Sequence, residues 1–175
     1  TGKTRIAKTI AFACGVKDLP FTDKTGYTTV AVTFVTADGE VTLSRSTKRG
    51  SSIEVVSTDP NVESGTYSLN NKSKQPVNNL LIGLLGINPG RQVITNEAFN
   101  KARFTWNAVR HILLVPESEI GRPDPSILLP KSSSSQSLTQ NLSALLVLAQ
   151  DENFDEATSR ESASDRRARR RVVER

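Results

Sequence analysis

The first residues of the chain match the end of a phosphate-binding loop, which in other proteins leads from a strand into a helix. The full pattern is G-x-x-x-x-G-K-[ST], and Gly2, Lys3 and Thr4 occupy its last three positions. In such a loop, backbone N–H groups surround the phosphates, the lysine contacts the β- and γ-phosphates, and the hydroxyl binds Mg²⁺. We therefore expect Lys3 to bind phosphate and Thr4 to bind the metal ion. The first glycine and its strand would precede Thr1, so the sequence would begin within the motif.

The residues after this tripeptide have the helical spacing that the motif requires. Ile6, Ile10 and Ala13 recur on one helical face, and Gly15 is a typical helix end. A helix that starts at Gly-Lys-Thr directs its unpaired N–H groups and its positive dipole end toward an anion. The alternative is an ordinary helix with a basic N-terminus, in which the tripeptide arises by chance.

Composition indicates one domain, or one lobe of a larger protein, in a reducing compartment. The chain has 175 residues, a net charge of +5 and one cysteine, Cys14, which excludes a disulfide framework. It has no signal peptide and no apolar stretch long enough to span a bilayer, so we expect a cytoplasmic protein without membrane contact. Much of the positive charge lies in one cluster near the end: Arg166, Arg167, Arg169, Arg170 and Arg171.

The middle of the chain predicts an antiparallel meander followed by short helices. Alternating, β-branched segments predict strands, and Asp38-Gly39 suits a type I′ hairpin turn. Helical spacing predicts three further helices, the last with Leu138, Leu142, Leu145, Leu146 and Ala149 on its apolar face. The expected strands are 27–36, 40–45, 52–57 and 65–69, with an extended piece at 91–95 and a buried strand at 112–115; the expected helices begin at 76, 105 and 137.

This order of elements resembles the N-terminal lobe of the ATPase head of structural-maintenance-of-chromosomes proteins and their double-strand-break-repair relatives. The segment 2–15 is similar to the family's G-K-S/T, helix, aromatic, small-residue and glycine segment. The meander resembles the antiparallel β-layer that follows it, and 104–120 resembles the approach to the Q-loop. The implied fold is α/β: a P-loop ATPase head lobe at 1–150, then a polar basic helix at 151–175 that begins a coiled coil or serves as a linker.

The resemblance implies an ATPase that uses ATP and Mg²⁺. Gly2, Lys3, Thr4 and Arg5 would bind the nucleotide, and Lys3 would act in catalysis. The Q-loop glutamine is replaced here by Glu117, with Glu119 as the other candidate, and a carboxylate at this position can bind Mg²⁺ and act in hydrolysis. The family's signature motif and catalytic Glu belong to a C-terminal lobe, so we expect this chain alone to hydrolyse ATP poorly.

The resemblance also implies partners and a cellular setting. A second head, as a homodimer, would enclose ATP, accessory subunits would join, and the assembly would act on DNA in a nucleoid-associated setting. That DNA action would serve chromosome organisation, repair or antiphage defence. The candidate DNA contacts are Arg45, Lys48 and Arg49 and the arginine cluster.

Two other interpretations stay open. One is a non-enzymatic DNA-binding or scaffolding module in which Gly2-Lys3-Thr4 is accidental. The other is an unrelated P-loop NTPase or kinase, which would need a parallel sheet and an apolar strand ending in Asp.

Overall fold

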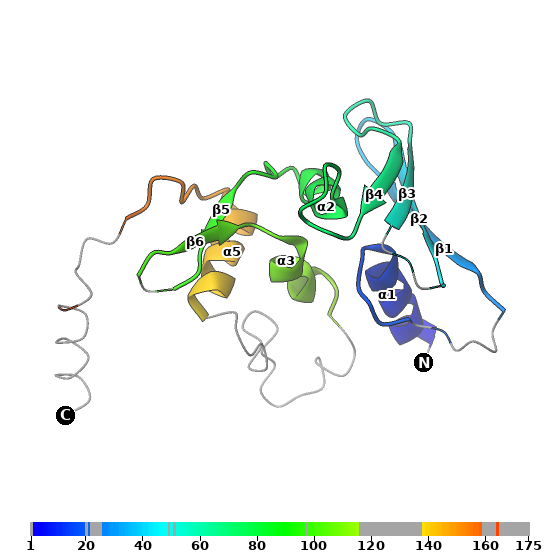
Figure 1. Ribbon diagram of the computed structural model, residues 1–175, viewed down its shortest axis with the longest axis horizontal. Coiled ribbons are helices and arrows are strands. Elements are labelled where there is room, and N and C mark those ends of the chain that lie inside the picture. Colours follow the sequence, from blue (N-terminus) through cyan, green and yellow to red (C-terminus); the bar gives the residue numbers. More distant parts are fainter. Residues whose placement is uncertain are drawn as a thin grey trace. The chain divides into compact units, whose positions relative to one another are not determined.

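The computed structural model describes residues 2–19, 21, 26–48, 50, 52–96, 98–115, 138–158 and 164. The chain divides into two compact units (Figure 1), and each is described by itself. The sheet unit is formed from 1–89 and 105–127, and the helix unit from 90–104 and 128–175. The sequence pattern predicts one lobe at 1–150, whereas the structure groups 138–158 with the segment 90–104.

The sheet unit contains the predicted meander as a four-stranded antiparallel sheet in the order β1-β2-β3-β4. The chain is therefore mixed α/β with short helices, as expected. The alternation of apolar and polar residues along each strand fixes the two faces of the sheet, because successive side chains of a strand point to opposite sides. Val32, Leu43 and Val55 are register partners on the core side, whereas Thr33 and Thr42 pair on the outer side. The strands are β1 (Thr29–Val35), β2 (Glu40–Ser46), β3 (Ser52–Ser57) and β4 (Gly65–Ser68).

The turn between β1 and β2 differs from the predicted type I′ turn. Val35 pairs with Glu40, so residues 36–39 form the connection. Neither Asp38 nor Gly39 has the positive φ that a type I′ turn requires. Gly39 is needed for a different reason, because a Cβ at this position would lie 2.7 Å from the backbone nitrogen of Asp59.

Three helices complete the sheet unit: α1 (Gly2–Ala13), α2 (Val77–Leu84) and α3 (Trp106–Leu113). Gly15 and Gly86 follow α1 and α2 with positive φ values of 100° and 75°, so both glycines end a helix as predicted. The predicted buried strand at 112–115 is wrong. Its first two residues continue α3, and Leu113 is 42% exposed. A short apolar run does not separate a strand from a helix by pattern alone.

The core of the sheet unit lies between the inner face of the sheet and α2. Its sheet side is formed by buried side chains from the three strands β2 to β4. Burial of each large apolar side chain stabilises the fold by about 1.5–3 kcal/mol. The buried cluster comprises Cys14, Val41, Leu43, Ile53, Val55, Tyr67, Val77, Leu80 and Leu81.

The helix unit pairs a small hairpin with one long helix. The hairpin is β5 (Gln92–Ile94) and β6 (Lys101–Arg103), and the helix is α5 (Leu138–Gln150). Strand β6 was not predicted. The helix confirms the predicted segment, but much of the predicted apolar face is wrong, since Leu142 and Leu146 are 43% and 41% exposed.

The observed buried face of α5 carries small and polar residues instead. Ala144 and Val147 are fully buried, and the Ser143 hydroxyl accepts a hydrogen bond of 2.9 Å from the Ile94 backbone N–H. After α5, Asp151 forms an ion pair with Arg91. The polar basic helix predicted from 151 does not begin there, because the described residues 151–158 contain no helix. None of the helices in the described ranges has the length and apolar character needed to cross a membrane.

Candidate functional site

The Gly-Lys-Thr segment forms the first turn of α1, which starts at Gly2. Lys3 is exposed and Thr4 is half-buried, so the lysine side chain is accessible to a ligand. The first backbone N–H groups of a helix have no partner within the helix, and the dipole adds positive potential there. The first turn of α1 contains no acidic residue that would oppose an anion. This end of α1 is suited to bind an anion.

A hollow of about 380 Å³ lies beside the same turn. Adding a Cβ to Gly2 would meet no atom within 4 Å, so the space near this glycine is open in the described structure. Ile6 lines the hollow and is 63% exposed. The lining is formed by Gly2, Arg5, Ile6, Thr9 and Ile10 of α1 together with Phe21, Ala31 and Val32.

The metal-binding part of the predicted site is only partly visible. Thr4 lies in the first turn of α1, whereas Glu117 and Glu119 fall outside the described residues. Among the residues that the structure describes, no group of three or more His, Cys, Asp or Glu side chains could hold a metal ion. Thr4 is therefore the predicted metal ligand whose position is known.

Arg45 is buried in the sheet unit and does not lie on the surface. Its side chain is buried, and its guanidinium donates hydrogen bonds to the backbone oxygens of Phe12 at 2.6 Å and Val16 at 2.7 Å. The guanidinium carbon also lies 4.1 Å from the centre of the Phe12 ring. Burial lowers the pKa of Arg45 from its usual value. Arg45 therefore joins β2 to the end of α1, and its buried guanidinium is not available to contact DNA.

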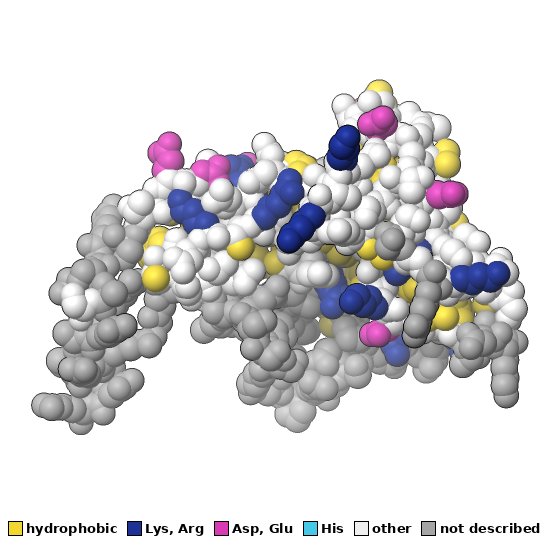
Figure 2. Space-filling view, viewed as in Figure 1, with side chains coloured by type: hydrophobic (Ala, Val, Ile, Leu, Met, Phe, Trp, Pro, Cys, Tyr) yellow, Lys and Arg dark blue, Asp and Glu magenta, His cyan; other side chains and the backbone are white. Residues whose placement is uncertain are grey.

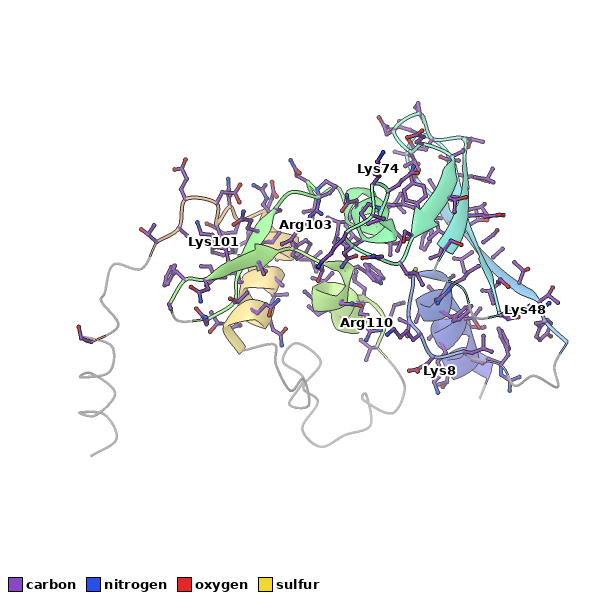
Figure 3. All side chains as sticks on the ribbon, in the orientation of Figure 1. Lys8, Lys48, Lys74, Lys101, Arg103 and Arg110 are labelled. Carbon is purple, nitrogen blue, oxygen red and sulfur yellow. The ribbon has the colours of Figure 1, made fainter. Side chains whose placement is uncertain are left out.

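The other candidate DNA contacts are exposed or lie outside the described residues. Lys48 is exposed just after β2, and Figure 3 shows it at the same end of the sheet unit as Lys8 of α1. On the displayed face, Lys and Arg side chains are spread out rather than gathered in one patch (Figure 2). The remaining candidates, outside the described residues, are Arg49, Arg166, Arg167, Arg169, Arg170 and Arg171.

Charge is divided along the β1–β2 hairpin. Asp38 and Glu40 lie at the turn end of the hairpin, whereas Lys48 follows the opposite end of β2. The three basic residues Lys3, Arg5 and Lys8 are on α1, whose sequence contains no Asp or Glu. Along this hairpin, a polyanion would therefore meet less repulsion at the end that carries Lys48 than at the turn.

One polar cluster was not anticipated from the sequence. The Thr36 hydroxyl donates to the Asp59 carboxylate at 2.6 Å, and the Asn61 backbone N–H donates to the same carboxylate at 2.8 Å. The Thr36 hydrogen bond is the main reason that the pKa of Asp59 is lowered. The signal in the sequence was weak, since Thr36 and Asp59 are 23 positions apart. The cluster holds the hairpin turn against the segment after β3.

Comparisons with protein-family models, with curated proteins and with solved structures find no match to this chain.

Proposed function

We propose that this chain is the N-terminal lobe of an ATPase head of the structural-maintenance-of-chromosomes type. The observation that carries the proposal is the position of Gly2-Lys3-Thr4 in the first turn of α1, with Lys3 exposed. A four-stranded antiparallel sheet follows this helix in the chain. The ATPase head lobe that the sequence resembles has the same order of elements.

In this proposal the chain binds ATP with Mg²⁺. The Lys3 ammonium neutralises charge on the β- and γ-phosphates, and the Thr4 hydroxyl binds Mg²⁺. Gly2 and Lys3 donate backbone N–H groups to the phosphates. Arg5, which follows Thr4 in the helix, also binds the nucleotide. Glu117 or Glu119 takes the place of the Q-loop glutamine and contacts Mg²⁺ and the attacking water.

The proposed assembly is a dimer of heads that acts on DNA. Two heads enclose ATP, with the P-loop of one facing the signature motif of the other, and hydrolysis releases them. DNA phosphates contact Lys48 and Arg49 and the arginine cluster at 166–171. The chain beyond 158 leads into a coiled coil, and accessory subunits bind the assembled heads.

The test is ATP binding by the intact protein with Lys3 replaced by alanine. A hydrogen bond to a charged group contributes about 1.5–3 kcal/mol, so Lys3→Ala should weaken ATP binding roughly 10- to 150-fold. Lys8→Ala is the matched control, because Lys8 is an exposed lysine on the same helix. Equal ATP affinity of the two variants would contradict the proposal.

A second variant separates the metal from the phosphate role. Thr4→Ala should keep part of the nucleotide affinity and lose much of its dependence on Mg²⁺, measured by titration with and without the ion. Absence of nucleotide binding by the unaltered protein would favour the scaffolding interpretation, in which the tripeptide has no role.

A further inference from the structure

Strand β1 is the edge of the four-stranded sheet, and one side of it has no strand partner among the described residues. The opposite side pairs with β2 along its whole length, from Thr29 with Ser46 to Val35 with Glu40. An unpaired strand edge presents a row of N–H and C=O groups that another strand can use.

The hydrogen-bond pattern shows which residues present these groups. Thr47 donates its backbone N–H to Thr28, and Thr36 donates to Gly39, so the even-numbered residues of this strand bond to β2. In an antiparallel pair, the residues between them direct their N–H and C=O groups away from the partner. The outward groups of β1 therefore belong to Thr29, Ala31, Thr33 and Val35.

The sequence of β1 has none of the features that usually protect an edge. Edge strands commonly carry charged residues, proline or a bulge, which prevent pairing with another chain. The segment Thr29–Val35 reads TVAVTFV and contains no charge, proline or glycine. Val35 is 79% exposed and Tyr27, just before the strand, is 61% exposed. Among the described residues, no strand pairs with this edge, so it can accept another strand.

The inner side of this edge is also incompletely covered. Val32 and Phe34 point to the core side of the sheet but are only half-buried. Val32 lines the hollow beside α1, where Ile6 is exposed. A strand added next to β1 would place alternate side chains over this apolar surface.

The pattern of β1 fits a second copy of itself. Antiparallel pairing about Val32 places Val30 of one copy opposite Phe34 of the other, and Val32 opposite Val32. The same register pairs Ala31 with Thr33 and Thr29 with Val35, which are the residues with outward N–H and C=O groups. Apolar side chains then meet on the core side, and because β1 carries no charge, the paired strands place no like charges opposite each other.

We propose that two copies of this chain associate through antiparallel pairing of their β1 strands, which joins the two sheets. This contact differs from the ATP-dependent contact of two heads, because it uses a strand edge and no nucleotide. It is therefore independent of the proposed ATPase function.

A proline at an outward position tests this pairing. Thr33→Pro removes an N–H that faces away from β2, so the bonds between β1 and β2 remain possible, and proline is tolerated at such edge positions. Thr33→Val is the matched control, because both variants lose the hydroxyl contact with Thr42 but valine keeps the N–H. Sedimentation equilibrium without nucleotide should show dimers for the unaltered chain and Thr33→Val, and monomers for Thr33→Pro.

Amide hydrogen exchange of the unaltered chain gives a second measurement that does not depend on the proline variant. The N–H groups of Ala31 and Thr33 should exchange slowly in concentrated solution and rapidly after dilution. Those of Val32 and Phe34 bond to β2 and should remain protected at both concentrations. Three results would each overturn the proposal. The unaltered chain could be monomeric at all concentrations, or Thr33→Pro could dimerise as Thr33→Val does. The exchange rates at Ala31 and Thr33 could also be independent of concentration.

Discussion

Replacement of Arg45 should weaken the attachment of α1 to the sheet. We consider Arg45→Met, which keeps a long apolar side chain but removes the guanidinium. The variant loses the hydrogen bonds to the backbone oxygens of Phe12 and Val16 and the contact with the Phe12 ring. These contacts hold the end of α1 and the residues after it against β2.

The structure allows an estimate of the cost. A hydrogen bond from a charged group contributes about 1.5–3 kcal/mol, and a guanidinium over an aromatic ring about 0.5–2 kcal/mol. The Phe12 oxygen also accepts from the Gly15 N–H, so it keeps a partner, whereas no other described residue donates to the Val16 oxygen. The variant no longer has to bury a charged guanidinium, and the free energy gained in this way offsets part of the loss. We expect a net destabilisation of about 3 kcal/mol, or on the order of 10 °C in Tm.

Urea and thermal unfolding measure this change, and hydrogen exchange shows where it acts. Amides in the last turn of α1 should lose protection more than those of β2 and β3. Lys48→Met is the control, because an exposed substitution usually changes stability by no more than about 0.5 kcal/mol. If Arg45→Met were as stable as Lys48→Met, the assigned role of Arg45 would be wrong.

Two further predictions concern titrating groups. The pKa of Asp59 is lowered, mainly by the Thr36 hydroxyl and then by the Asn61 N–H. The ionised Asp59 should therefore stabilise the fold fully above the usual carboxyl pKa of about 3.9, and this stabilisation should be lost as the pH falls below that pKa. Acid unfolding curves should therefore be less steep for Asp59→Asn and Thr36→Val; curves identical to the unaltered chain would contradict this. Burial raises the pKa of Cys14 from 9.0 to about 12, so its stabilising effect should decline as the pH rises from 9.0 toward 12. Cys14 should react with alkylating reagents at pH 8 far more slowly in the folded chain than in urea, and equal rates would show that the thiol is accessible.

The sequence determined the elements whose signals are local. The period of the apolar residues and the position of Gly15 predicted α1 and its end, and alternation predicted all four strands of the sheet. These signals depend on neighbouring residues alone, because helical spacing and strand alternation are properties of short segments. The placement of Lys3 in the first turn of α1 followed from the same reasoning.

The tertiary structure decided which faces are buried and which edges are open. Arg45 looked like a surface cation, but it is buried inside the sheet unit. Phe12 of α1 supplies a carbonyl group and an aromatic ring, and Val16, which follows α1, supplies a second carbonyl group. The leucines of α5 predicted one buried face, but β5 lies against a different face of the helix. There the Ser143 hydroxyl accepts a hydrogen bond from the backbone N–H of Ile94. The free edge of β1 depends on strand order, which no segment encodes by itself. Burial and exposure arise from the meeting of distant segments, so local periodicity does not determine them.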